Sequence, residues 1–317
     1  MKKHLTTLIS VAILFSACGG SRKAPESELS GTISISGAFA LYPLAVKWAE
    51  EFREFHPHVR IDLSAGGAGK GMTDVLANVV DIGMVSRDVY PVEEQRGAVA
   101  FAVAKDAVVP TISTNNPALT DLLKKGLTRD AAYNLWISGE TKTWGQVAGT
   151  SDRNPVHLYT RSDACGAGET WAQWLDKKQE DLGGTAVFGD PGLAQAVQRD
   201  RLGIGYNNLS YTYDEGTRLP NPGIIVLPID VNGNGIIDDD ERFYETKDCI
   251  IAAIAADKFP SPPARDLYLV TNGVPKNPAV VAFIKFILTE GQQYNVPIGF
   301  ISLSEEKLQK GLVLLGN

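Results

Sequence analysis

Three junctions in the sequence, each where a β-rich run gives way to a helical pattern, contain runs of small residues. They cover residues 36–43, 64–71 and 161–170. At such a junction the first N–H groups of the helix have no partner within the helix and lie at the positive end of its dipole. Small residues let a ligand approach this backbone, so each junction is suited to an anion. Arg161 begins the third junction and can hold an oxyanion through two parallel N–H bonds, with Asp163 placed to orient it.

A second motif predicts a metal site. Residues 230–241 match the calcium-loop pattern D-x-[DN]-x-[DN]-G-x5-E at every required position. Oxygen ligands of such a loop converge on a hard cation, and Gly235 permits the turn. A β-rich run (224–229) rather than a helix precedes the loop, so we expect an isolated, structural Ca2+ site; an acidic surface turn is the alternative. The predicted ligands are Asp230, Asn232, Asn234, Ile236 through its carbonyl, Asp238 and Glu241.

Motifs for covalent or nucleotide chemistry do not emerge from the sequence. Gly69 and Lys70 partly match a nucleotide-binding P-loop, but Ser64 and Gly71 stand where that motif needs Gly and Ser or Thr. Neither H-E-x-x-H nor G-x-S-x-G occurs. We therefore expect no catalytic residues and a protein that is not an enzyme.

The elements that position the junctions follow a β-α-β-α-β order, which occurs once before residue 86 and again over 156–206. This order predicts parallel sheets covered by helices, hence an α/β fold of two lobes with a ligand cleft between them. Extended segments near 107–112 and 266–271 can cross from one lobe to the other. We expect lobe 1 to comprise 32–110 plus 268–317, and lobe 2 to comprise 111–267 with the calcium loop.

The N-terminus predicts export. A short basic start and an apolar run, far shorter than the ~20 residues of a spanning helix, indicate a signal peptide over 1–17. Small residues before Cys18 resemble a bacterial lipobox, so we expect lipidation of Cys18 and a flexible tether over 18–31; a plain cleaved signal peptide is the alternative. In an exported chain Cys165 and Cys249 are either joined in a disulfide or both free.

The charge of the chain is acidic. The 317 residues carry a net charge of −7, which argues against general nucleic-acid binding. Removing residues 1–17 takes away Lys2 and Lys3 and no acidic residue, so the net charge falls from −7 to −9. An anion must therefore be attracted by local backbone dipoles and by Arg161 rather than by the overall charge.

The same stretches, taken together, resemble a known family. The stretches 34–37, 40–44, 48–52, 66–71, 81–87, 115–117, 161–163 and 203–206 are similar to those of the substrate-binding proteins of phosphate ABC transporters. The resemblance covers residues 32–317. It implies a type II periplasmic-binding-protein fold that holds phosphate between two lobes and delivers it to a membrane permease. Several hydroxyl residues usual in that family are replaced here, by Ala38 and Phe39, by Ala68, and by Cys165 and Ala167.

The resemblance and the junctions together imply a lipid-anchored solute-binding protein for inorganic phosphate or a similar tetrahedral oxyanion. We expect a monomer that docks on an ABC permease. The alternatives are a calcium-stabilised exported protein of the same fold that binds another anion or a protein partner, and a phosphoester-processing enzyme. The expected anion-binding residues are Ala40, Leu41, Tyr42, Ala68, Gly69, Ser86, Arg87, Arg161, Asp163, Cys165, Gly166 and Ala167.

Overall fold

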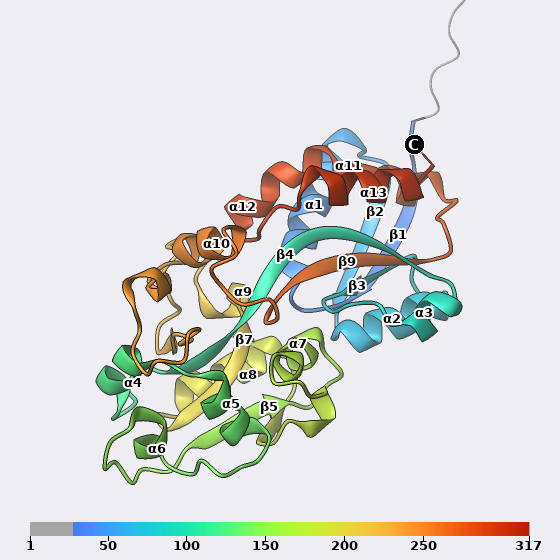
Figure 1. Ribbon diagram of the computed structural model, residues 1–317. Coiled ribbons are helices and arrows are strands. Elements are labelled where there is room, and N and C mark those ends of the chain that lie inside the picture. Colours follow the sequence, from blue (N-terminus) through green and yellow to red (C-terminus); the bar gives the residue numbers. More distant parts are fainter. Residues whose placement is uncertain (1–27, 317) are drawn as a thin grey trace, which may run out of the picture.

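A computed structural model describes residues 28–316 (Figure 1). The predicted signal peptide and Cys18 lie outside these residues. The strands are β1 (Gly31–Gly37), β2 (Val59–Ala65), β3 (Ile82–Val85), β4 (Ala98–Ser113), β5 (His157–Arg161), β6 (Thr185–Val187), β7 (Gly203–Asn208), β8 (Ile224–Val226) and β9 (Ala264–Asn272). They join in the order β2-β1-β3-β9-β4-β7-β5-β6, with β8 paired to β4.

Helices cover the sheet in both lobes. In lobe 1 they are α1 (Tyr42–Phe55), α2 (Ala68–Leu76), α3 (Pro91–Gln95), α11 (Pro278–Leu288), α12 (Asn295–Ile298) and α13 (Glu305–Leu314). In lobe 2 they are α4 (Leu119–Lys125), α5 (Arg129–Trp136), α6 (Trp144–Ala148), α7 (Gly166–Trp174), α8 (Gly189–Arg199), α9 (Leu209–Thr212) and α10 (Lys247–Ala255). Within residues 28–316, no helix is long and apolar enough to cross a membrane.

Strands β4 and β9 pair antiparallel in lobe 1, and β4 alone continues into lobe 2, as Figure 1 shows. Each lobe has its own hydrophobic core. The first core uses residues up to Ala104 and from Leu267 on, and the second uses Ala107 to Ala264 together with Ile301. The chain thus passes from the first core to the second at residues 105–106, within strand β4, which continues unbroken to Ser113.

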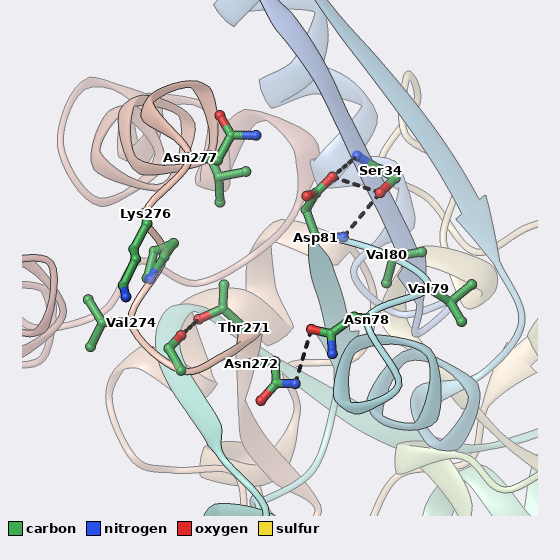
Figure 2. Close-up of a pocket in the computed structure, with 13 residues that line it drawn as sticks. Ser34, Asn78, Val79, Val80, Asp81, Thr271, Asn272, Val274, Lys276 and Asn277 are labelled. Carbon is green, nitrogen blue, oxygen red and sulfur yellow. Dashed lines mark hydrogen bonds between the residues drawn. The ribbon is translucent and has the colours of Figure 1, made fainter.

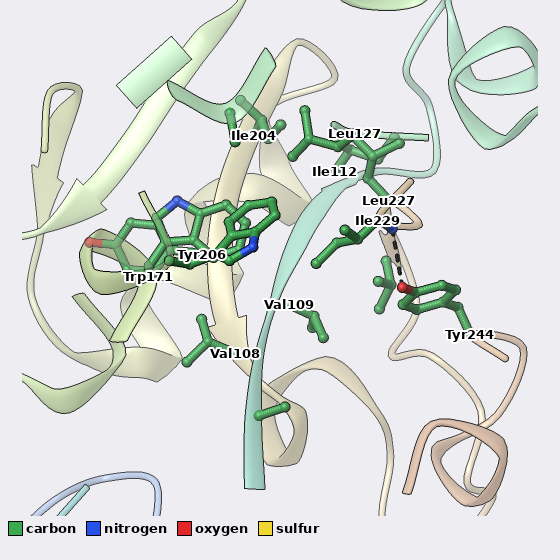
Figure 3. Close-up of a cluster of buried hydrophobic side chains, with 14 of the residues drawn as sticks. Val108, Val109, Ile112, Leu127, Trp171, Ile204, Tyr206, Leu227, Ile229 and Tyr244 are labelled. Atoms are coloured by element: carbon green, nitrogen blue, oxygen red, sulfur yellow. Dashed lines mark hydrogen bonds between the residues drawn. The ribbon is translucent and has the colours of Figure 1, made fainter. Parts of the chain in front are cut away.

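The core of lobe 2 lies on both sides of β4. Figure 3 shows the indole of Trp171 beside the ring of Tyr206 on one side of the strand, with Leu227 and Ile229 on the other. The Trp171 and Tyr206 rings are stacked, with centroids 5.8 Å apart. This packing fixes α7 against β7, and therefore fixes the start of α7, where the third junction lies.

Three helices begin within runs of small residues. Helix α2 begins at Ala68, α7 at Gly166 and α8 at Gly189. Glycine favours loops in sequence patterns, but here the small residues form the first helical turn itself. Consequently the unpaired N–H groups of these helices lie inside the junctions.

Candidate functional site

The second junction and Ser86, both in lobe 1, face the third junction, in lobe 2, at very short range. Gly69 donates its N–H to the carbonyl of Ala164 at 3.1 Å. A Cβ atom on Gly67 would lie 2.8 Å from a carboxylate oxygen of Asp163, and one on Gly166 would lie 2.0 Å from the carbonyl oxygen of Ser86. Only glycine permits such an approach, so the two lobes are in direct contact through their junctions.

Four N–H groups of the junctions have no hydrogen-bond acceptor anywhere in residues 28–316. They belong to Ala40, Ala68, Gly166 and Ala167, all four of which are buried. A buried backbone donor without an acceptor costs about as much as a lost hydrogen bond, and such groups are rare in folded proteins. Because these donors come from all three junctions and from both lobes, a small acceptor-rich ligand would satisfy them together.

Arg161 lies beside these donors with its guanidinium completely buried. It donates to both carboxylate oxygens of Asp163, at 2.8 and 2.6 Å, and to Oδ2 of Asp190 at 2.5 Å. Burial alone lowers the pKa of Arg161, but the attraction of Asp190 and Asp163 outweighs it and raises the pKa above its usual range. Two of the five N–H bonds of the guanidinium have no acceptor among the described residues, so they are free to bind a ligand.

Other predicted residues lie at the site but are engaged elsewhere. The N–H groups of Leu41 and Tyr42 donate to carbonyls within their own turn, at 3.3 and 3.2 Å. The Arg87 guanidinium forms two hydrogen bonds with the Glu93 carboxylate, at 2.7 and 2.9 Å, and stacks on the Tyr90 ring. The side chain of Arg87 is thus held by α3.

Cys165 and Cys249 are both free thiols in the structure, Cys165 buried and Cys249 exposed. The Cys165 sulfur accepts a hydrogen bond from the N–H of Gly168 at 3.2 Å and so caps α7, as a serine hydroxyl would. Burial raises the pKa of the Cys165 thiol to about 12. Cys165 is therefore a neutral capping group rather than a nucleophile.

Two residues that the sequence did not single out as ligand-binding complete the site. Asp190, in the first turn of α8, holds Arg161 from the side opposite Asp163. The Phe39 ring lies 5.7 Å from the Arg161 guanidinium, and its carbonyl accepts a hydrogen bond from the Tyr211 hydroxyl of lobe 2 at 3.1 Å. The sequence Gly189-Asp190-Pro191-Gly192 is itself a strand-to-helix junction, which was the available signal for Asp190.

The predicted calcium loop closes on itself through its own polar groups. Both carboxylate oxygens of the buried Asp230 accept backbone N–H bonds at 2.7 Å, from Gly233 and Gly235. Glu241, also buried, accepts N–H bonds from Val231 and Asp238 at 2.8 and 3.2 Å. Among residues 28–316, no group of three or more His, Cys, Asp or Glu side chains is arranged to hold a metal ion. The calcium site stays a prediction.

A large cavity lies in lobe 1, at the end of the sheet away from the carboxyl ends of strands β1, β2 and β3. It has a volume of about 620 Å³, is lined by Ser34, Asp81 and the loop that follows β9, and is drawn in Figure 2. Asp81 precedes β3, whereas the junctions follow the carboxyl ends of the parallel strands. The cavity is therefore separate from the candidate site.

Comparisons with known proteins agree with this geometry. Residues 23–290 match the family model described as the PBP superfamily domain. The chain is 27% identical over 311 residues to the phosphate-binding protein PstS of Pseudomonas aeruginosa, covering 92% of this chain and 88% of that one. It is 28% identical over 240 residues to PstS of Bacillus subtilis, covering 71% and 77%.

Solved structures show the same fold. The structure of a proposed phosphate ABC transporter substrate-binding protein from Clostridium perfringens, with bound phosphate, superimposes with a TM-score of 0.70 at 22% identity, covering 86% of this chain and 100% of that one. The two lobes joined by β4 and β9 thus form the type II periplasmic-binding-protein fold expected from the sequence. With its family model matched over most of its length, the chain belongs to the PBP superfamily.

Proposed function

We propose that this protein binds inorganic phosphate between its two lobes and presents it to an ABC transporter. The observation that carries the proposal is the set of four N–H groups without an acceptor, on buried residues of all three junctions. The junctions of both lobes come together near Arg161, since Gly67 lies against Asp163 and the Phe39 ring lies 5.7 Å from the Arg161 guanidinium. A tetrahedral oxyanion offers several acceptors in a small volume and can satisfy donors on opposite walls at once. The names of the PstS relatives support phosphate as that oxyanion.

Asp190 supports a protonated oxyanion in particular. Arg161, Asp163 and Asp190 together carry a net charge of −1 when ionised, so a fully deprotonated anion gains no net attraction from them. A carboxylate accepts hydrogen bonds and cannot donate when ionised, and each of its oxygens has two acceptor sites. Hydrogen phosphate has a proton to donate, whereas sulfate at neutral pH has none. Asp190 would therefore favour phosphate over sulfate.

Calorimetry tests this function on a soluble chain that begins at Gly19. Phosphate, sulfate, molybdate and tungstate are titrated separately, with and without calcium. We expect phosphate to bind tighter than millimolar and sulfate to bind more weakly. If no oxyanion binds tighter than millimolar, the proposed function is wrong. A phosphoester that is turned over, with activity lost in Arg161→Ala, would instead indicate the enzyme alternative.

We also propose that the protein is exported and anchored by lipid at Cys18. The basic start, the apolar run and the small residues before Cys18 support this proposal. Cells fed a labelled fatty acid should transfer the label to the wild-type chain and not to Cys18→Ser. If neither chain is labelled and the mature N-terminus is not at Cys18, the protein has a plain cleaved signal peptide and no lipid anchor.

The loop 230–241 is proposed to bind one structural Ca2+. Its support is the complete sequence motif and the burial of Asp230 and Glu241, at the first and last ligand positions. At a calcium concentration 100 times Kd, binding stabilises the fold by about 2.7 kcal/mol, which raises the melting temperature by about 5 °C. Glu241→Gln should abolish the rise. Asp239→Asn, an exposed change in the same loop, should retain it, and an unchanged wild-type transition would refute the site.

A further inference from the structure

Arg265 is a buried arginine at the point where β9 leaves lobe 2, and no ligand-binding role has been assigned to it so far. Its Nε donates to Oδ1 of Asp106 at 3.2 Å, and the two residues are paired partners on the antiparallel strands β4 and β9. Its Nη1 donates to the carbonyl of Gly166 at 2.6 Å and to the hydroxyl of Thr170 at 3.1 Å. One side chain therefore connects strands β4 and β9, near the boundary between the lobes, to the first turn of α7.

The third nitrogen of Arg265, Nη2, is connected to Arg161 through the side chains of Asn208 and Asp190. Arg265 Nη2 donates to Oδ1 of Asn208, and Asn208 Nδ2 donates to Oδ1 of Asp190 at 2.5 Å. Asp190 in turn accepts from Arg161 at 2.5 Å. An arginine has only donors and a carboxylate only acceptors, so the amide of Asn208 can join them in one orientation alone. Arg265 thus fixes the orientation of the Asn208 amide that donates to Asp190.

Every member of this chain of contacts is at least nine-tenths buried: Asp106, Arg265, Asn208, Asp190 and Arg161. Hydrogen bonds between buried charged and polar groups are strong, and the loss of one member leaves its neighbours unsatisfied. Gly166, whose carbonyl Arg265 holds, supplies one of the free N–H donors and packs against Ser86 of lobe 1. The boundary between strands β4 and β9, the first turn of α7 and the Asp190–Arg161 pair are therefore joined by one set of buried contacts.

We propose that Arg265 is a positioning residue for anion binding. It holds the Gly166 turn and, through Asn208, the Asp190–Arg161 pair in the arrangement that accepts the ligand. This role rests on the proposed function, since the ligand is phosphate. Arg265 itself does not contact the ligand; it acts through Gly166 and Asn208.

The test compares Arg265→Lys with Arg129→Lys. Lysine keeps the charge but cannot reach Asp106, Gly166 and Asn208 together. Arg129 is a half-exposed arginine of lobe 2 that pairs with Asp176 and donates to the carbonyl of Trp174 at the far end of α7. It contacts none of Asp106, Gly166 and Asn208, so it serves as a matched control. We expect Arg265→Lys to weaken phosphate binding about tenfold and Arg129→Lys to leave it unchanged. Asn208→Ala, which breaks only the link to Asp190, serves if Arg265→Lys does not fold.

Two readouts separate positioning from a general loss of stability. In 15N-labelled chains, the Nε–H resonance of Arg161, assigned by its absence in Arg161→Lys, should shift in Arg265→Lys and in Asn208→Ala but not in Arg129→Lys. On an Arg161→Lys background, Arg265→Lys should weaken phosphate binding less than it does in the wild type, because only the contact with Gly166 is then left for Arg265 to provide. Additive losses or an unmoved resonance would overturn the proposal. If the wild-type chain binds no phosphate, the proposed function fails, and the resonance alone decides the role of Arg265.

Discussion

Gly166→Ala should weaken ligand binding strongly while leaving the unliganded fold nearly as stable as before. The new Cβ would lie 2.0 Å from the carbonyl oxygen of Ser86 and 2.3 Å from its hydroxyl. Ser86 belongs to lobe 1 and Gly166 to lobe 2, so the clash exists only when the lobes are in contact. An alanine at the first position of α7 is acceptable within lobe 2, since alanine favours helices.

The magnitude follows from the distances. Restoring an ordinary contact of 3.4 Å requires the junctions to separate by about 1.4 Å. Such a separation breaks the 3.1 Å hydrogen bond from Gly69 to Ala164, worth about 0.5–1.5 kcal/mol. It also removes at least one hydrogen bond between the ionised ligand and one lobe, worth about 1.5–3 kcal/mol. The sum, about 2–4.5 kcal/mol, corresponds to binding about 30- to 2,000-fold weaker.

Phosphate calorimetry and unliganded thermal unfolding should be measured on the same variants. Gly216→Ala is the control, because it makes the same change in lobe 2 where the nearest atom, Oδ1 of Asp214, lies 3.6 Å away. A Gly166→Ala variant that binds phosphate within about threefold of wild type would refute the lobe-contact reasoning. If the unliganded variant loses as much free energy of unfolding as it loses in phosphate binding, the clash lies within lobe 2 instead.

Three further outcomes are expected. With the chain beginning at Gly19, a thiol reagent at pH 8 should label Cys249 at once and Cys165 only on unfolding; two fast thiols would contradict the burial that raises the pKa of Cys165 to about 12. Burial raises the pKa of Asp106 to about 6 from 3.8, so its contribution to the free energy of unfolding falls as the pH rises from about 4 to 6. In denaturant unfolding, the stability of Asp106→Asn relative to wild type should therefore increase by up to about 3 kcal/mol over that range. A stability difference that stays constant with pH would contradict this prediction. Asp190→Asn should reduce the preference for phosphate over sulfate in competition calorimetry, and an unchanged preference would remove Asp190 from the selectivity argument.

The sequence predicted the three junctions because their signal is local. Gly67, for example, has φ +93°, a conformation that glycine adopts readily, and it lies directly between β2 and α2. The two-lobed fold was predictable for a similar reason, since hydrophobic periodicity and strand-helix alternation are properties of neighbouring residues. These features need no knowledge of which distant segments meet.

The partners of the charged residues were not predictable in this way. Arg161 and Asp190 are 29 positions apart and meet only because β5 and α8 pack together. The sequence pattern of neither element specifies this packing. Arg87 carried a suitable charge just after strand β3, but the carboxylate of Glu93 on the short helix α3 binds its guanidinium. The type of each residue and its place in the sequence therefore identified candidate hydrogen-bond donors. Tertiary packing decided which of these donors remain available to a ligand.

Arg161 shows how an acidic chain can hold an anion. A completely buried guanidinium loses its hydration at a cost of several kcal/mol unless carboxylates offset that loss, and Asp163 and Asp190 do so. The same carboxylates cancel its positive charge, so net charge contributes no attraction for the ligand. The four buried N–H groups of the junctions have already lost water on folding and have no acceptor, and a ligand oxygen recovers that cost directly. Because these donors come from both lobes, the full gain is available only when the lobes are in contact, and this requirement couples ligand capture to lobe closure.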